Sequence, residues 1–478
     1  MARARAGSHR PRPLAPDLFL TAGMGQTLGM TCAIVVGASV AGLLTARVLS
    51  GLVDEVVVME RERLADTPSP RGHVPQARHL HLLLTAGLDL LVAWFPGIDV
   101  ELERTGAVWI DGTRAWVYQA GGYRAQGDWG RPALSMTRPL LEQVVRRRIA
   151  ALDNVRLDDG VVVDRVDVSD GRVSGVVAGA VSHRTDLVVD CSGRSSRIAH
   201  QLQSSGILAP PVTRVAIDCA YASGFLPRSA EDFEGSFLVC GTSPPTSFRG
   251  GAVLPVEGNR WMVTLAGVHG DVPGTAEEEV LAFARSLLSP AVAQLLERAG
   301  PLSSVASYRF PSSQRRHYEK VRRLPPGFVT LGDAACSFNP IYGQGMACAA
   351  LQADALADSV RQVGVRSEQL PRRYHRRAAR IIDAAWTIAV GADFLHPKTV
   401  GAKARGTDQV NAYVLRVVKA SHTSVQLARS FNLVLNLVEP PRTLARPSVL
   451  ARVLASSVPG GRRQTPVGHP RVGPPNTV

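Results

Sequence analysis

The chain has 478 residues, of which 45% are hydrophobic and 20% are charged, and its formal net charge is +14. This length predicts two or three domains, or one large composite, with a core that needs neither disulfides nor metal. The composition excludes a disordered, fibrous or disulfide-scaffold protein. No nucleic-acid-binding module is visible, so we attribute the excess of arginine to solvated surface and some attraction for phosphates or acidic partners.

The cysteines and the N-terminal region bear on location. The six cysteines form no C-x-x-C pair and match no zinc site, so we expect no metal and interpret them as free thiols of a cytoplasmic protein. Residues 18–46 carry no charged side chain, and this length would suit a membrane span. Because five glycines interrupt the stretch, we expect no span. Residues 1–30 are interpreted as a flexible N-terminal extension.

The first ordered elements form a βαβ unit. Residues 31–36 are an apolar, β-branched run typical of a buried strand, residues 40–50 predict a helix, and residues 54–60 predict a second strand. Such an order indicates a parallel sheet and an α/β fold.

A glycine-containing turn joins the first strand to its helix. It resembles the G-x-G-x-x-G fingerprint, with serine at the second glycine, and consists of Gly37, Ala38, Ser39, Val40, Ala41 and Gly42. Gly37 permits the tight turn, the small residue at 39 lets the backbone approach a pyrophosphate, and Gly42 lets the helix pack closely on the strand. Glu60 ends the second strand, where a carboxylate can accept the hydroxyls of an adenosine ribose. The pattern predicts a dinucleotide site without distinguishing FAD from NAD.

The middle of the chain alternates helical and strand patterns. In chain order we expect a helix over 79–95, a helix over 139–151, several strands within 155–190, and a hairpin of 251–256 with 260–268.

The C-terminal half is expected to be mainly helical. Thr275 and Glu278 fit a capping box that opens a helix to about residue 299. Residues 327–331 predict a short buried strand, and helices dominate from 345 to about 455. The tail over 459–478 is rich in Pro, Gly and Arg, and this composition predicts disorder.

A second constellation follows the strand at 327–331. Residues 332–346 read Gly-Asp-Ala-Ala-Cys-Ser-Phe-Asn-Pro-Ile-Tyr-Gly-Gln-Gly-Met and lead into a helix. Asp333 can accept a hydrogen bond from a ligand hydroxyl, and Gly343 and Gly345 let the backbone lie against a flat ring. The positive end of the following helix can stabilise an anion.

With these two motifs, the chain resembles the FAD-dependent monooxygenases of the para-hydroxybenzoate-hydroxylase-like superfamily. The segment from Arg71 to His79 is similar to an Arg-x-Gly-Val-Pro-Gln-x-Arg-His stretch of a bacterial branch that includes polyketide-tailoring enzymes and polyether epoxidases, and the segment around Arg138 is similar to one that contacts the cofactor. The family's Asp-Gly motif is replaced by Ser192-Gly193, with the acid displaced to Asp190.

The resemblance assigns residues to the cofactor. Besides the turn from Gly37 to Gly42, it implies FAD contacts from Glu60, Arg61, Arg71, Arg138, Asp333, Pro340, Gly343, Gln344, Gly345 and Met346. It places the reactive edge of the flavin near Asn339, Pro340 and Tyr342 and implies no catalytic triad.

The resemblance also implies an architecture. A Rossmann-like FAD-binding domain (31–104, 129–205 and 319–385) is interleaved with a β-sheet substrate domain (105–128 and 206–318), and a C-terminal helical region (386–458) follows. The substrate cavity is expected between the flavin and the sheet, with aromatic residues of the first sheet segment as candidate lining: Trp109, Trp116, Tyr118, Tyr123 and Trp129.

The implied activity is epoxidation or hydroxylation of a large apolar, polyketide-like intermediate through a C4a-hydroperoxyflavin. NADPH, or a separate flavin reductase, is the expected electron source. Two alternatives stay open: a non-redox FAD-dependent cyclase of the [4+2] cycloaddition type and an isoprenoid-saturating flavin reductase. A flavin halogenase is disfavoured, because that class needs a lysine in the first third of the chain and the first lysine is Lys320.

Overall fold

The computed structural model describes residues 29–204, 206–456 and 468–473. Most of the predicted N-terminal extension lies outside these residues. A five-stranded parallel sheet forms one part of the molecule, in the order β18 (Phe328–Thr330), β12 (Leu187–Asp190), β1 (Cys32–Val36), β2 (Glu55–Glu60) and β8 (Val155–Asp159). Its central strands read as continuous apolar runs because both faces of the sheet are covered.

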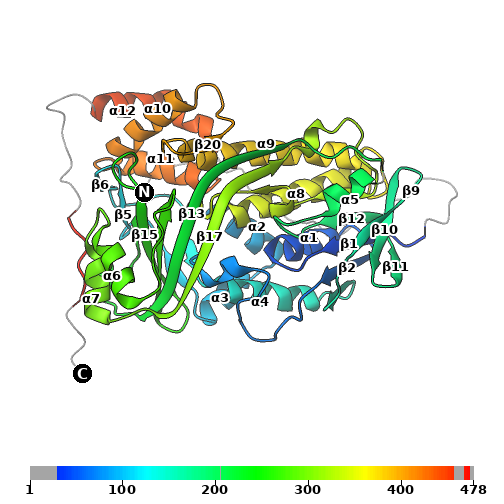
Figure 1. Cartoon of the computed structure of the whole chain (residues 1–478), viewed down its shortest axis with the longest axis horizontal. Helices are drawn as coiled ribbons and strands as arrows, with labels where there is room; N and C mark the ends of the chain where they lie inside the picture. Colours follow the sequence, from blue (N-terminus) through cyan, green and yellow to red (C-terminus); the bar gives the residue numbers. More distant parts are fainter. Residues whose placement is uncertain (1–28, 205, 457–467, 474–478) are drawn as a thin grey trace, which may run out of the picture.

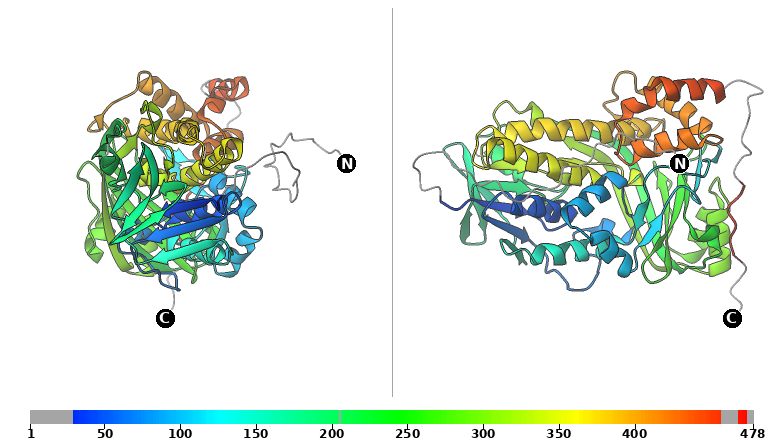
Figure 2. Two further views of the ribbon diagram at one scale, coloured as in Figure 1. Left: turned by 90° about the vertical axis from the view of Figure 1, so that its right-hand side faces the viewer. Right: turned by 180° about the vertical axis from the view of Figure 1, so that it is seen from behind.

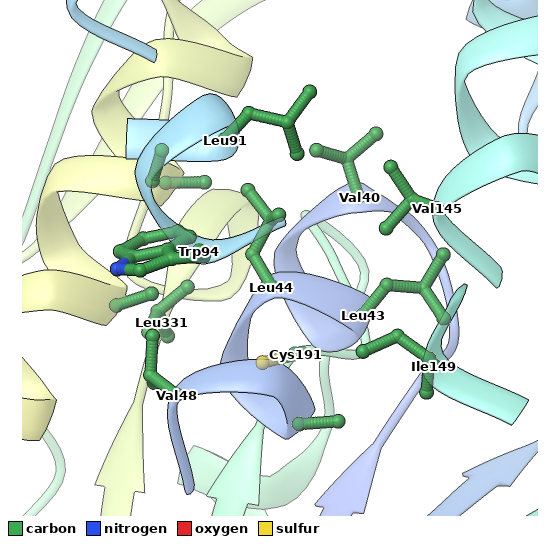
Figure 3. Packing of buried hydrophobic residues seen from close by; sticks show 14 of the residues in the cluster. Val40, Leu43, Leu44, Val48, Leu91, Trp94, Val145, Ile149, Cys191 and Leu331 are labelled. Atoms are coloured by element: carbon green, nitrogen blue, oxygen red, sulfur yellow. The ribbon is translucent and has the colours of Figure 1, made fainter. Parts of the chain in front are cut away.

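Helix α1 (Val40–Ser50) is packed into the centre of this α/β part. Its apolar side chains meet those of α2 (Thr85–Trp94), α4 (Arg138–Ala150) and α8 (Gly345–Val363). Figure 3 shows Leu43 of α1 facing Ile149 of α4, with Leu44 beside Trp94 of α2. The helix that carries the phosphate-binding turn is therefore fixed by the main hydrophobic core.

The second part is a nine-stranded sheet. Its order is β19 (Cys336–Ser337), β17 (Ser303–Arg316), β13 (Val212–Pro227), β16 (Arg260–Val268), β15 (Arg249–Val256), β14 (Leu238–Cys240), β5 (Trp116–Gln119) and β6 (Gly122–Tyr123), with β20 (Val400–Gly401) paired to β13. The long strands β13 and β17 run from this sheet toward the α/β part (Figure 1). Helices α6 (Glu277–Arg285) and α7 (Ala291–Ala299) pack on the sheet.

Two small sheets and the remaining helices complete the fold. The small sheets are β3 (Leu82–Leu83), β7 (Ala133–Ser135) and β4 (Val108–Ile110), and β11 (Val181–Arg184), β10 (Arg172–Ala178) and β9 (Arg165–Ser169). The helices are α3 (Ile98–Arg104), α5 (Ile198–Ser204), α9 (Leu370–Asp393), α10 (Thr407–Ala420), α11 (Val425–Leu435) and α12 (Pro447–Ser456). The last three form a layer above the end of the nine-stranded sheet (Figure 2). The predicted fold class, a Rossmann-like part interleaved with a β-sheet part plus C-terminal helices, is confirmed.

Two helix predictions were wrong in detail. The predicted helix 79–95 begins only at Thr85, because Leu82 and Leu83 pair with β7 as a strand. The predicted helix to 299 is divided into α6 and α7, since Pro290 lacks the N–H needed to continue a helix. At the start of α6, Glu279 rather than Glu278 accepts the backbone N–H groups of Thr275 and Ala276, both at 3.2 Å.

A short C-terminal segment departs from the predicted disorder of 459–478. Residues 468–473 bind the short helical turn Asp232–Gly235 that links two strands of the nine-stranded sheet, where the backbone carbonyl of Arg471 accepts from Phe233 at 2.8 Å and Gly473 donates to the Asp232 carboxylate at 3.1 Å. The tail therefore returns to the sheet after a stretch outside the described residues.

Within the part of the chain that the structure describes, no helix is both long and apolar enough to cross a membrane.

The buried Asp232 generates a stability prediction. Its carboxylate is fully buried, pairs with Arg298 of α7, and accepts the Trp261 indole N–H at 3.0 Å. Asp232→Asn leaves the Arg298 charge buried without its partner, and we expect the free energy of unfolding in urea to fall by about 3 kcal/mol.

The control for this experiment lies on the same helix. Glu297 of α7 forms an exposed ion pair with Arg285, so Glu297→Gln should change the free energy of unfolding by less than about 1 kcal/mol. Equal losses in both variants would contradict the prediction.

Candidate cofactor-binding and active site

The phosphate-binding turn has a geometry that requires glycine. Gly37 has φ +102°, and its N–H donates to the Met59 carbonyl at 2.8 Å. A Cβ atom at Gly42 would lie 1.8 Å from the Gly37 carbonyl oxygen. Ser39 is the N-cap residue of α1, yet its side chain makes no hydrogen bond to the helix. The N-terminus of α1 is thus available to an anion.

Buried charges surround this turn. Glu60 accepts from the Ala38 N–H at 2.8 Å and pairs with Arg71 at 3.0 Å. Glu142 of α4 accepts from the Ser39 hydroxyl at 2.7 Å and from Arg138 at 2.9 Å. Two arginines and two glutamates, from three separate segments, therefore lie beside the predicted pyrophosphate and ribose positions.

Glu142 was missed by the sequence analysis. Burial would raise the pKa of its carboxyl group, but the charges of Arg138 and Arg71, together with hydrogen bonds from Ser39 and Arg138, hold the pKa below its ordinary value. Glu142 therefore stays ionised and orients both arginines. The sequence did contain one indication of this pairing, because Glu142 lies four residues after Arg138 on the same helix.

The two glycine-containing motifs meet in space. A Cβ atom at Gly332 would lie 2.8 Å from the Cβ of Ala41, although these positions are nearly three hundred residues apart in the chain. Asp333 lies near enough to Arg138 and Arg194 for their charges to oppose the rise in its pKa that burial causes. Both bends thus belong to one site.

Gln344 is a buried side chain at this site that lacks protein partners. Arg71 is paired with Glu60 at 3.0 Å and with Glu142 at 3.3 Å. Within the described residues, by contrast, neither amide atom of Gln344 makes a hydrogen bond, and Gln344 is only 1% exposed. Buried polar groups are nearly always satisfied, so these atoms indicate a ligand with acceptors and donors of its own. FAD carries both kinds of group, and the residues present fit it.

Not every predicted contact residue presents its side chain to the site. Val40 and Met346 are buried in the hydrophobic core, so only their backbone atoms can face a cofactor. Arg61 is exposed. Gly343 has φ +65° and ends the short helical turn Pro340–Tyr342, and Gly345 begins α8, where an added Cβ would lie 3.9 Å from the Asp333 carboxylate.

The predicted position of the reactive flavin edge is a hydrogen-bonded turn, Pro340–Tyr342, that is preceded by the buried Asn339. The Asn339 amide oxygen accepts from the Ile341 N–H at 3.2 Å and from the Tyr221 hydroxyl at 3.2 Å. Tyr221 stacks on Tyr308, directly opposite on the neighbouring strand, with ring centroids 6.4 Å apart. The turn is therefore joined to the nine-stranded sheet through aromatic residues.

His79 completes this surface. Its ring lies 5.9 Å from that of Tyr221 and 5.8 Å from that of Tyr308, and its Nδ1 lies 2.8 Å from the Ser223 hydroxyl. Burial, and to a smaller extent the charge of Arg78, lowers the pKa of His79 to about 4. His79 is therefore neutral at physiological pH. Tyr221 and Tyr308 were not singled out from the sequence, because strand alternation gives their face but not their neighbours.

The aromatic residues expected to line the substrate cavity do not gather there. Trp116 and Tyr123 pack edge to face at the far end of the nine-stranded sheet, 5.6 Å apart. Trp129 lies under the Arg124 guanidinium, and Trp109 is exposed on the small sheet. Packing within the sheet accounts for Trp116, Tyr118 and Tyr123, and Trp116 also lines the cavity described next.

A separate cavity of about 830 Å³ lies at this far end, lined in part by Trp116, Gln126, Glu234, His422 and His469. Strand β5 is close to one edge of the nine-stranded sheet, whereas β19, from the second flavin motif, forms the other edge. This cavity is therefore distinct from the site that the two motifs form.

Asp190 has a structural role. Its fully buried carboxylate accepts from the Ser192 backbone and hydroxyl at 3.0 and 2.6 Å and from the Ser196 hydroxyl at 2.5 Å. These contacts fix the loop after β12, whose Arg194 donates to the hydroxyl of Ser337, within the second motif, at 2.7 Å.

The fold and the site define a dinucleotide-binding flavoprotein. Residues 30–389 match the model of the FAD binding domain family. The chain belongs to this family. It is also 30% identical over 444 residues to Protein Rv3254 of Mycobacterium tuberculosis (strain ATCC 25618 / H37Rv), a match that covers 89% of this chain and 94% of that protein.

Solved structures share the fold. PqsL of Pseudomonas aeruginosa, described as a probable FAD-dependent monooxygenase, has a TM-score of 0.61 at 18% identity over 76% of this chain and 96% of its own. A 2-methyl-3-hydroxypyridine-5-carboxylic acid oxygenase has a TM-score of 0.59 at 18% identity, covering 75% and 90%. The flavin-dependent brominase Bmp2 has a TM-score of 0.56 at 15% identity, covering 89% and 94%. The family match makes the chain an FAD-binding enzyme, and these likenesses, at 15–18% identity, show that it shares the fold.

Gly42 provides a test of the cofactor site. Gly42→Ala places a methyl group against the Gly37 carbonyl, so the turn must shift, and we expect FAD affinity measured by fluorescence titration to fall at least about tenfold.

Gly51 serves as the matched control for this variant. It ends the same helix with φ −91°, and an added methyl group there would have no atom within 4 Å. Gly51→Ala should leave FAD affinity within about twofold of wild type. The assignment of the turn fails if Gly42→Ala binds FAD as tightly as Gly51→Ala.

Proposed function

We propose that the enzyme is a monooxygenase that epoxidises or hydroxylates a large apolar, polyketide-like intermediate. The observation that carries this proposal is the buried Asn339, whose amide oxygen accepts from Tyr221, a ring that stacks on Tyr308 and lies beside His79. Neutral aromatic side chains beside the reactive edge suit oxygen transfer to an apolar substrate.

Bound FAD would supply two-electron reduction and the activation of O₂. Held by the turn at Gly37 and by Asp333, it would extend toward Asn339, Pro340 and Tyr342. The protein's own contribution is to exclude water and to orient the substrate. His79 supports this role, because its neutral ring adds no charge to the buried surface and is held by Ser223.

We also propose NADPH as the electron source, delivered directly or through a separate flavin reductase. Asp190 is fully engaged with Ser192 and Ser196, and a carboxylate so engaged is poorly suited to bind a second nucleotide. This arrangement supports delivery by a separate reductase over direct binding.

The proposal predicts a yellow protein whose flavin bleaches anaerobically when NADPH is added together with a general flavin reductase. Admission of air in the presence of a polyketide carrying an alkene or an electron-rich ring should then give a product with one atom of oxygen from ¹⁸O₂, detected by mass spectrometry.

The controls separate the competing reactions. Boiled enzyme with the reductase should give no labelled product, and NADPH alone should bleach the flavin slowly. Product that forms without bleaching and without O₂ would overturn the proposal and support a cyclase. A protein that takes up no FAD would contradict the assignment of the cofactor as well.

A further inference from the structure

Asp393 is a buried acid that belongs to none of the motifs recognised in the sequence. It is the last residue of α9 and is 0% exposed. Its Oδ1 atom accepts from the Asn339 amide at 2.8 Å and from the Tyr342 hydroxyl at 3.3 Å. Both partners belong to the turn that is predicted to meet the reactive edge of the flavin.

The direction of these hydrogen bonds is fixed by the surroundings of Asn339. Its amide oxygen already accepts from Tyr221 and from the Ile341 N–H, so its amide nitrogen must be the atom that donates to Asp393. Asp393 therefore acts as the acceptor that orients the Asn339 side chain, and through it the hydroxyl of Tyr221.

The second oxygen of Asp393 is free of these bonds. Within the described residues, Oδ2 is buried and has no hydrogen-bond partner. An ionised carboxylate would be costly in this position, whereas a proton on Oδ2 leaves Oδ1 able to keep both of its bonds. The geometry thus accommodates the neutral acid without loss of the contacts to the turn.

The titratable groups that face Asp393 do not compensate a negative charge. They are Cys219 and Tyr221 of β13 and Tyr342 of the turn, and burial raises the pKa of all three, so they are neutral acids.

The remaining nearby groups do not change this balance. Thr399 donates to the Asp393 backbone carbonyl at 2.6 Å, and Asn411 of α10 donates to the Gly391 carbonyl at 2.8 Å. Burial lowers the pKa of His396 to about 4, so this ring is neutral, and the charge of Lys398 acts on His269. Burial raises the pKa of Asp393 itself to about 7, although its hydrogen bonds to Asn339 and Tyr342 oppose the rise.

We propose that Asp393, which holds Asn339 and Tyr342 in place, is a positioning residue for the flavin. We further propose that protonation of Asp393 is coupled to cofactor binding. The inference rests on the proposed placement of the flavin edge at this turn. A bound ring displaces water from the turn and further disfavours the ionised acid. FAD should therefore bind more tightly when Asp393 is protonated. By thermodynamic linkage, bound FAD should favour protonation of Asp393 by the same factor.

The test compares wild type with Asp393→Asn, which keeps an acceptor for Asn339 and Tyr342 but cannot ionise. FAD dissociation constants are measured by fluorescence titration of the apoprotein at several values between pH 5.5 and 8.5. A pKa displaced by one unit corresponds to a tenfold change in affinity, and we expect wild-type affinity to fall about three- to tenfold across pH 7. Asp393→Asn should change less than about twofold.

A second readout needs no cofactor. The pKa of Asp393 in the folded protein lies above the unfolded value of about 3.9, so the native state binds this proton more strongly. The stabilisation that the bound proton provides is present at low pH and is lost as the pH rises toward 7. The melting temperature of wild-type apoprotein should therefore fall relative to that of Asp393→Asn between pH 5 and pH 8. Asp408→Asn, at an exposed carboxylate of α10, serves as the control and should follow wild type.

The outcomes are distinguishable. If FAD binds but the pH profiles of wild type and Asp393→Asn are parallel in both measurements, the inference is overturned and the proposed function stands. If the melting temperatures diverge but FAD affinity does not, Asp393 titrates without being coupled to the cofactor, and the inference again fails. If no FAD binds to wild type at any pH, the proposed function and the inference fall together.

Discussion

The contact between Gly332 and Ala41 is the constraint on which the site depends. It joins the helix after the first strand to the segment after strand β18, and it leaves no room for a side chain at Gly332. Because both segments lie at the carboxyl ends of strands in one parallel sheet, their helix N-termini meet at one edge of that sheet, where ligands bind in open α/β folds. The buried arginines and glutamates lie beside this edge.

Much of the fold could be predicted because its signals are local. The apolar run 32–36, the turn from Gly37 to Gly42 and the hairpin around Gly258 each depend on residues that are neighbours in the chain. The predicted helix at 79 failed because a strand pairing with residues 133–135, which no local pattern reveals, replaced its first turns. The same limit applies to the aromatic residues, whose strand positions were recognisable and whose neighbours were not.

The candidate site shows the same division. The two motifs identified the backbone positions around Ala41 and Gly332, and the structure brings them together. Glu142 and Asp393 escaped detection because their importance comes from buried partners: two arginines for the first, and the Asn339 turn for the second. The sequence analysis also placed Asp393 in the C-terminal helical region and not in the FAD-binding domain. The expected boundary between these regions, at residue 385, falls inside the continuous helix α9. Burial and pairing are properties of the tertiary structure, and one sequence does not contain them explicitly.

Strand β19 has a consequence for how the protein can be dissected. It lies within the second flavin motif, yet it pairs with β17 at the edge of the nine-stranded sheet. Excision of the α/β part as an autonomous folding unit would remove β17, leave the backbone groups of Cys336 and Ser337 without their ladder, and expose an edge prone to self-association. The second flavin motif is therefore complete only when the nine-stranded sheet has folded, and the enzyme should be produced as an undivided polypeptide.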